Sequence, residues 1–138
     1  MRGNDVFLEA PSRTQELLNI KWTLKAAGFR IGSTWHDDSG IASTVSKDHW
    51  DEKGIEQLQA CDSLVVICGS DTAAAASAAM IAGLALARGL QVVWIGPWFG
   101  GLNAFSAVRR FNTADDYERE VLRGMYSESA SNTEQIAA

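Results

Sequence analysis

Residues that could hold a metal ion or a disulfide framework are scarce in this chain. It has two cysteines and two histidines among 138 residues. Cys61 and Cys68 lie seven positions apart, and neither His36 nor His49 has a second ligand at the spacing of a helical metal motif. A zinc site and a disulfide scaffold are therefore excluded. We interpret the cysteines as core thiols in a reducing compartment and expect no metal and no cofactor.

A long apolar run and a cluster of basic residues are also missing. No stretch approaches the roughly 18 apolar residues of a membrane span, and no apolar leader follows Met1. The net charge is -5 and the lysines and arginines are scattered singly, which argues against nucleic acid or an anionic membrane as the main partner. The sequence predicts a cytoplasmic protein whose ligand is a small molecule.

What the chain does contain is an alternation of strand and helix patterns. Residues 64–67 and 92–95 are apolar and rich in β-formers, and between them the segment Ala73–Ala87 holds nine alanines in fifteen positions. This order predicts a βαβ unit of a parallel sheet. The length and the 46% hydrophobic content fit one domain with one core.

Further elements are expected on both sides of this unit. Strands are predicted at residues 6–9, 29–35 and 108–111, the second of them near an edge of the sheet. Helices are predicted to open at Pro11, to run from Ser46 to about Ala60, and to run from residue 114 to about 125 after a Thr113 cap. Residues 1–126 are expected to form the single domain, and the polar residues 127–138 a disordered tail.

Five strands and about four helices in alternation predict a three-layer α/β fold, a doubly wound parallel sheet in the flavodoxin-like order 2-1-3-4-5. The segment 64–67 is apolar on both faces, as the central strand requires. Ligands of such sheets bind beyond the carboxyl ends of the strands. The candidate segments are therefore 9–13, 35–38, 69–72 and 96–103, together with the helix around Asp51.

Four short motifs, in order along residues 5–123, together resemble one enzyme family. They are Val6-Phe7-Leu8-Glu9-Ala10-Pro11, which is similar to a Tyr-Leu-Ala-Gly-Pro turn after an opening strand, Asp51 to Ile55 followed by Ala60-Cys61-Asp62, Gly83 to Gly89, and Gly96-Pro97 with Asn103-Ala104-Phe105. The family is that of the nucleoside 2-deoxyribosyltransferase-like proteins, which include deoxynucleotide N-glycosidases. The resemblance implies a nucleoside or nucleotide ligand and a homodimer formed through the helix Ala73–Ala87.

The chain departs from this family where the chemistry is expected. The resemblance implies a nucleophilic glutamate two residues before the helix glycine, and Ile81 stands there. The tyrosine of the opening strand is replaced by Phe7 and the glycine by Ala10, whereas the acid that serves the leaving base is matched by Asp51. Because only a carboxylate readily forms the covalent glycosyl intermediate, the expected function is nucleoside or nucleotide binding without that chemistry.

Two alternatives stay open at this stage. One is an active N-glycosidase or deoxyribosyltransferase with a relocated carboxylate at Glu9, Asp51 or Asp71, and the other is an interaction module of flavodoxin-like fold. The candidate catalytic residues are Asp51 and Glu9. The candidate ligand-binding residues are Phe7, Ala10, Pro11, Ser12, Arg13, Trp35, Asp71, Thr72, Ile81, Trp98 and Asn103.

Overall fold

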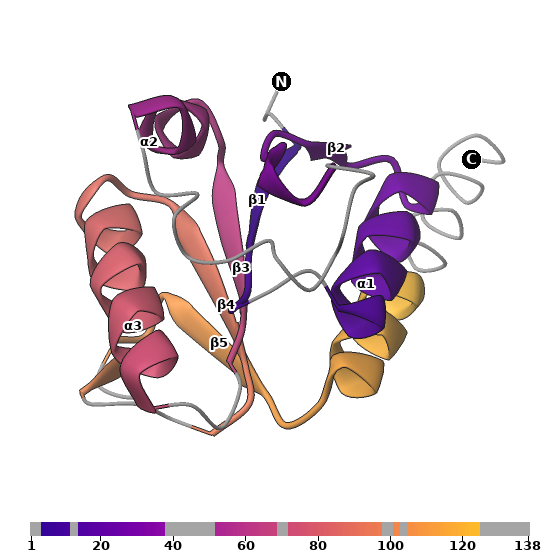
Figure 1. Ribbon diagram of the computed structural model, residues 1–138. Helices are drawn as coiled ribbons and strands as arrows, with labels where there is room; N and C mark the ends of the chain where they lie inside the picture. Colours follow the sequence, from indigo (N-terminus) through magenta and orange to yellow (C-terminus); the bar gives the residue numbers. More distant parts are fainter. Residues whose placement is uncertain are drawn as a thin grey trace, which may run out of the picture.

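A computed structural model describes residues 4–11, 14–37, 52–68, 72–97, 101–102 and 105–124. Its centre is a five-stranded, all-parallel sheet in the order β2-β1-β3-β4-β5 (Figure 1). The strands are β1 Asp5–Glu9, β2 Arg30–Ile31, β3 Ser63–Ile67, β4 Gln91–Ile95 and β5 Val108–Phe111. The predicted topology, with β3 as the central strand, is therefore confirmed.

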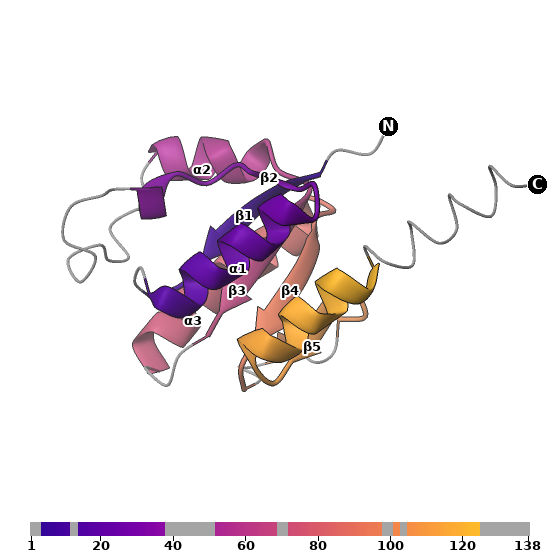
Figure 2. The ribbon, with the colours of Figure 1, turned by 90° about the vertical axis from the view of Figure 1, so that its right-hand side faces the viewer.

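Helices cover both faces of this sheet. They are α1 Gln15–Ala26, α2 Glu52–Gln59, α3 Thr72–Ala87 and a further helical segment at residues 114–124, with one 3-10 turn, η1 Trp35–Asp37. In Figures 1 and 2, α2 and α3 lie on one side of the sheet, and α1 lies beside the segment 114–124 on the other. This is the doubly wound arrangement that the alternation predicted.

The two faces of the sheet carry two apolar clusters because strand side chains alternate. Phe7, Leu64 and Val66 pack toward α3, in a cluster that includes Ala78 and Ala82. The intervening residues of β1 and β3 pack against α1 and the segment 114–124. Leu64, Val65 and Val66 expose no more than 1% of their surface, so β3 is buried on both faces.

Both cysteines, predicted as core thiols, are free in the structure, Cys61 buried and Cys68 half-buried. Burial, followed by the charges of Asp5 and Asp62, raises the pKa of Cys61 to about 11. Burial also raises the pKa of Cys68. Both thiols therefore favour their protonated, unreactive form at neutral pH.

Two predicted boundaries are wrong. Helix α1 begins at Gln15 rather than at Pro11, because the Thr14 side chain caps it by accepting a hydrogen bond from the Leu17 amide at 3.2 Å. The second strand is a two-residue edge strand and not a strand over 29–35, since the Gly32 amide makes the last backbone bond to β1 and the Ser33 and Trp35 side chains pair with Leu8 beyond it.

The predicted start of the second helix at Ser46, and the predicted disorder of residues 127–138, lie outside the described residues. Glycines with positive φ follow the ends of α1 and α3, namely Gly28 and Gly89. At the last helical segment the Asp116 amide donates to Thr113 Oγ1 at 3.1 Å, which confirms the predicted cap. In the described part of the chain, no helix combines the length and the apolar character that crossing a membrane requires.

Candidate functional site

The carboxyl edge of the sheet, at the bottom of Figure 1, is the place where doubly wound folds bind ligands. In the order 2-1-3-4-5, the winding direction changes between β1 and β3, which is the point where folds of this class form their ligand crevice. Glu9 is the last residue of β1 and pairs in register with Val66 of β3. Its exposed fraction is only 4%. The structure thus places a buried acid at the switch point of the sheet.

Two further predicted residues lie on the side of the sheet that α3 covers. Phe7 precedes Glu9 by two positions, so both lie on the same face of β1. Phe7 is fully buried, and half-buried Ile81 of α3 packs against the cluster that contains it. The structure therefore brings Glu9, Phe7 and Ile81 to one side of the sheet.

Side chains from the segment after β2 continue the hydrogen bonding of β1. The Leu8 amide donates to Ser33 Oγ at 3.0 Å, and Trp35 Nε1 donates to the Leu8 carbonyl at 2.7 Å. These two bonds satisfy the backbone groups that a longer β2 would have paired. The Trp35 indole, predicted as a stacking surface for a base, thus holds this segment against β1 through its N–H group.

His36 links Ser33 to a charged pair. Its Nε2 lies 2.8 Å from Ser33 Oγ, and its Nδ1 lies 3.3 Å from Asp37 Oδ1, which also receives a hydrogen bond from Lys21 Nζ. Because Ser33 Oγ already accepts the Leu8 amide, its hydroxyl proton can be donated to His36 Nε2, which leaves the imidazole proton on Nδ1, facing Asp37.

The order serine, histidine, aspartate is that of a hydrolytic triad, but burial indicates a structural role here. Ser33 exposes 1% of its surface and His36 none. The serine oxygen that would attack a substrate is already bonded to the Leu8 amide. We interpret this polar network as a brace that fixes the carboxyl end of β1, where Glu9 stands.

Asp37 and Lys21 anchor the outer end of this brace. Burial of the Asp37 carboxyl acts to raise its pKa, but the hydrogen bond and charge of Lys21, with the charges of His36 and Lys25, outweigh burial and lower the pKa. Asp37 is therefore ionised at neutral pH and accepts the hydrogen bond of Lys21 Nζ.

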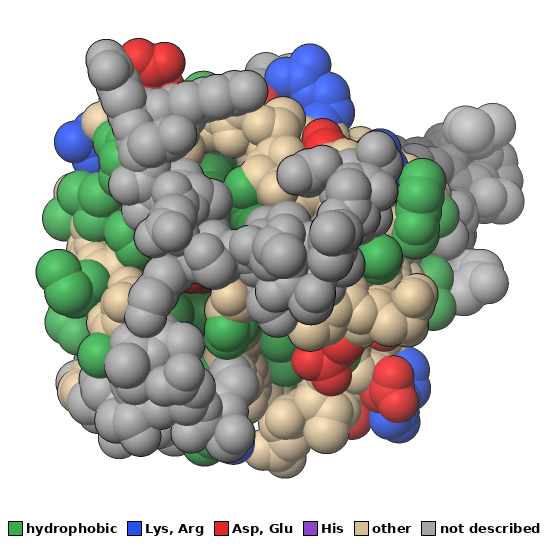
Figure 3. Space-filling view, viewed as in Figure 1, with side chains coloured by type: hydrophobic (Ala, Val, Ile, Leu, Met, Phe, Trp, Pro, Cys, Tyr) green, Lys and Arg blue, Asp and Glu red, His purple; other side chains and the backbone are tan. Residues whose placement is uncertain are grey.

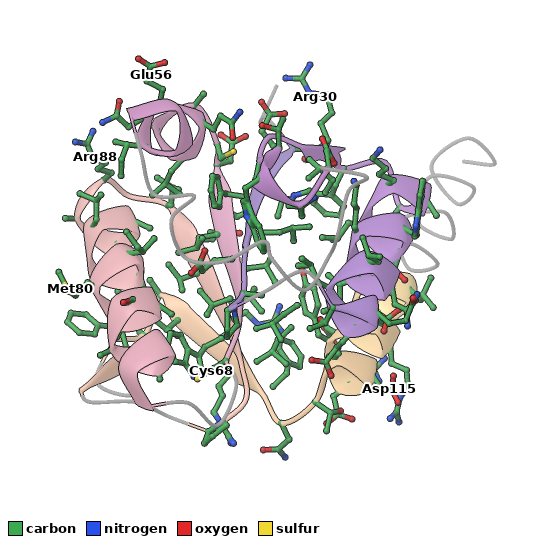
Figure 4. All side chains as sticks on the ribbon, viewed as in Figure 1. Arg30, Glu56, Cys68, Met80, Arg88 and Asp115 are labelled. Atoms are coloured by element: carbon green, nitrogen blue, oxygen red, sulfur yellow. The ribbon has the colours of Figure 1, made fainter. Side chains whose placement is uncertain are left out.

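The ends of β3, β4 and β5 are tied together on the other side of the switch point. Arg110 Nε donates to the Gly96 carbonyl and Trp94 Nε1 to the Pro97 carbonyl, each at 2.7 Å. Gly96 has a φ of 123°, and a Cβ there would lie 2.7 Å from the Cys68 carbonyl oxygen. Cys68 marks this edge in Figure 4. The loop after β4 therefore leaves the sheet at a defined place.

The described residues cover only part of the predicted site. Ala10 is buried and Pro11 half-buried just beyond Glu9. Thr72 begins α3. The predicted residues outside the described part of the chain are Ser12, Arg13, Asp51, Asp71, Trp98 and Asn103.

Sequence reasoning missed the roles of Ser33, His36, Asp37 and Arg110. Ser33 was assigned to an alternating strand, so its hydroxyl was not considered as a partner for a backbone amide. The available signal was a serine and a histidine three positions apart at a strand end, a spacing typical of a turn. Among the described residues, no group of three potential metal ligands is found. Comparisons with protein-family models, with curated proteins and with solved structures gave no match.

Proposed function

We propose that the protein binds a nucleoside or nucleotide at the carboxyl ends of β1 and β3 and lacks covalent glycosyl-transfer chemistry. The observation that carries this proposal is the position of Glu9, a buried acid at the switch point of the sheet. Carboxylates at strand ends of doubly wound folds accept hydrogen bonds from ribose hydroxyls. The net charge of -5 also favours a small ligand over a nucleic acid.

The surroundings of Ile81 support the second half of the proposal. A covalent glycosyl intermediate requires a carboxylate beside the anomeric carbon. Ile81 packs instead against the apolar cluster of Phe7, which offers neither a charge nor a hydroxyl. An apolar wall of this kind suits the face of a base or a sugar ring.

The binding proposal is tested by thermal unfolding with ribonucleosides, deoxynucleosides and the 5′-monophosphates of both. A ligand at 100 times its dissociation constant stabilises the folded state by about 2.7 kcal/mol. We expect stabilisation of the wild type and a much weaker effect in Glu9→Gln. The matched control is Glu16→Gln, because Glu16 is an exposed acid in the first turn of α1. If no nucleoside or nucleotide stabilises the wild type, the proposal is wrong.

A relocated carboxylate is the second candidate function, favoured by the shared side of Glu9 and Ile81. A Glu9 oxygen would bond to the anomeric carbon as the C–N bond breaks, and the base would leave with the electron pair and take up a proton from water. Chromatography of released base separates the two candidates. Release that survives Ile81→Ala and disappears in Glu9→Gln would replace the binding proposal, whereas binding without release supports it.

We also propose that two copies of the chain pair through α3. No charged residue occurs from Thr72 to Ala87, and Met80 is 77% exposed on the side of α3 away from the sheet (Figure 4). Hydrophobic side chains gather along this helix in Figure 3. Small residues recur at every fourth position, Ala75, Ala79, Gly83 and Ala87, but this row turns around the helix, since Ala75 is buried while Gly83 and Ala87 are exposed. The proposed seam therefore centres on Met80, Gly83 and Ala87.

A further inference from the structure

A hollow lies at the opposite edge of the sheet from Glu9. Asn4, Ser63 and Gln91, at the amino ends of β1, β3 and β4, contribute to its lining. The hollow runs between the end of α1 and the segment 114–124, which lie side by side on one face of the sheet (Figures 1 and 2). Its volume of about 610 Å³ is within the range of small-molecule sites.

Part of the hollow is lined by apolar side chains. Val65 and Val93 of the two central strands line it, together with Phe29 after α1 and Val121 of the segment 114–124. β-Branched and aromatic side chains of this kind bind an apolar body by excluding water from it. These side chains fit a compact apolar body, whereas Asn4, Ser63 and Gln91 in the same lining can pair with a polar group.

Tyr117 supplies a polar atom in this apolar setting. Its exposed fraction is 8%, it lines the hollow, and its ring packs edge-on against Phe111 with centroids 5.3 Å apart. The residues that the structure describes provide no hydrogen bond to its hydroxyl. Burial raises the pKa of Tyr117 to about 12, against the opposing charge of Arg109, so the hydroxyl stays a neutral donor.

Arg109, which lines the hollow, shares its carboxylate partner with a second arginine. Arg109 and Glu120 both line it, and Arg109 Nη2 lies 3.5 Å from Glu120 Oε2. The other carboxylate oxygen of Glu120 is engaged by Arg123 Nη1 at 3.0 Å. Two guanidinium groups thus share one carboxylate, which leaves Arg109 incompletely neutralised and able to attract an anion.

We propose that this hollow is a binding site for a small amphipathic monocarboxylate with an aromatic or branched apolar body. The body lies on Val93, Phe29 and Val121. The carboxylate accepts hydrogen bonds from the Tyr117 hydroxyl and the Arg109 guanidinium, both of which belong to residues that line the hollow. The site is separate from the nucleoside site at the carboxyl edge and does not depend on it.

The test uses the full chain, 3-phenylpropanoate as the probe and 3-phenylpropanamide as its uncharged match. We expect the carboxylate to shift the backbone amide signals of Val65, Val93 and Val121 in NMR titrations, with saturation at or below about 10 mM. The amide should bind about tenfold more weakly, because it offers no charge to Arg109. Tyr117→Phe and Arg109→Gln should each weaken carboxylate binding by a similar factor.

The control variant is Arg119→Gln. Arg119 belongs to the same helical segment, pairs with Asp116 and does not line the hollow, so binding should be unchanged. Tyr117→Phe keeps the ring that packs on Phe111, and circular dichroism of both site variants establishes that they are folded. Absence of carboxylate binding, equal affinity for the amide, or unchanged binding in both site variants would each overturn the proposal.

Discussion

The Ser33 hydroxyl accepts the Leu8 amide at 3.0 Å and so takes the place of a backbone carbonyl from a third residue of β2. The same hydroxyl lies 2.8 Å from His36 Nε2. One oxygen therefore connects the sheet with the turn that follows its edge strand. The end of β1, and with it Glu9, depends on this side chain as much as on the sheet.

Removing the Ser33 hydroxyl should lower the free energy of unfolding. Ser33→Ala leaves the buried Leu8 amide without its acceptor, and an unsatisfied buried group costs about 1 to 3 kcal/mol. Urea denaturation of the variant measures the loss. Ser106→Ala, at an exposed turn, is the control and should stay within about 0.5 kcal/mol of the wild type. An equally small effect of Ser33→Ala would contradict the brace.

Gly96 should tolerate no side chain. Gly96→Ala combines a φ of 123° with a Cβ placed 2.7 Å from the Cys68 carbonyl oxygen, so strain and a backbone clash act together. Backbone strain alone costs about 1 to 3 kcal/mol, and we expect a loss at or above the top of that range. Gly101→Ala is the matched control, because a Cβ there meets nothing within 4 Å. Thermal unfolding of the two variants should differ clearly; equal melting temperatures would refute the clash.

The pKa of Asp37 should depend on Lys21. Because the folded-state pKa lies below the ordinary 3.8, this carboxylate stabilises the fold above that pH, and its contribution is lost as the pH falls through the lower value. Lys21→Gln should raise the pKa, measured by NMR titration of the carboxyl carbon, and should make acid unfolding less steep. Lys25→Gln, which removes only a more distant charge, should raise it less. An unchanged pKa in Lys21→Gln would contradict the ion pair.

Met80 tests the proposed pairing of two copies. Met80→Glu places a charge on the exposed face of α3, away from the sheet. In size-exclusion chromatography with light scattering, we expect the wild type to be a dimer and the variant to be shifted toward the monomer. Trp22→Glu is the control on α1, since Trp22 is also exposed, at 62%. A wild type that is monomeric at all concentrations would exclude the pairing.

The sheet could be predicted from the sequence because its signals are local. Leu64 to Ile67 form an apolar run that only a doubly covered strand explains, and the alanines after it suit a helix that lies close to a sheet. Chain order and the handedness of crossovers then leave few topologies. The order of the five strands followed from these facts alone.

The site was predicted less completely because its contacts are long-range. Ser33 and Leu8 are 25 residues apart, and nothing in the local pattern of either indicates that a hydroxyl will replace a strand partner. Glu9 could be placed at the crevice by its position after an apolar strand, but its burial depends on packing between layers. Arg110 escaped notice for the same reason, because its bond to Gly96 joins two separate strand ends.

The shortness of β2 has a consequence for the behaviour of the chain in a crowded solution. An exposed edge strand is a template on which another chain can add a strand, and long flat edges promote aggregation. Here the edge strand β2 ends after two residues. Beyond its end, the Ser33 and Trp35 side chains bind the Leu8 amide and carbonyl of β1, so these backbone groups are not free to pair with another chain. The opposite edge, β5, carries exposed Arg109 and Arg110. Both borders of the described sheet therefore resist intermolecular strand addition, one by brevity and the other by charge.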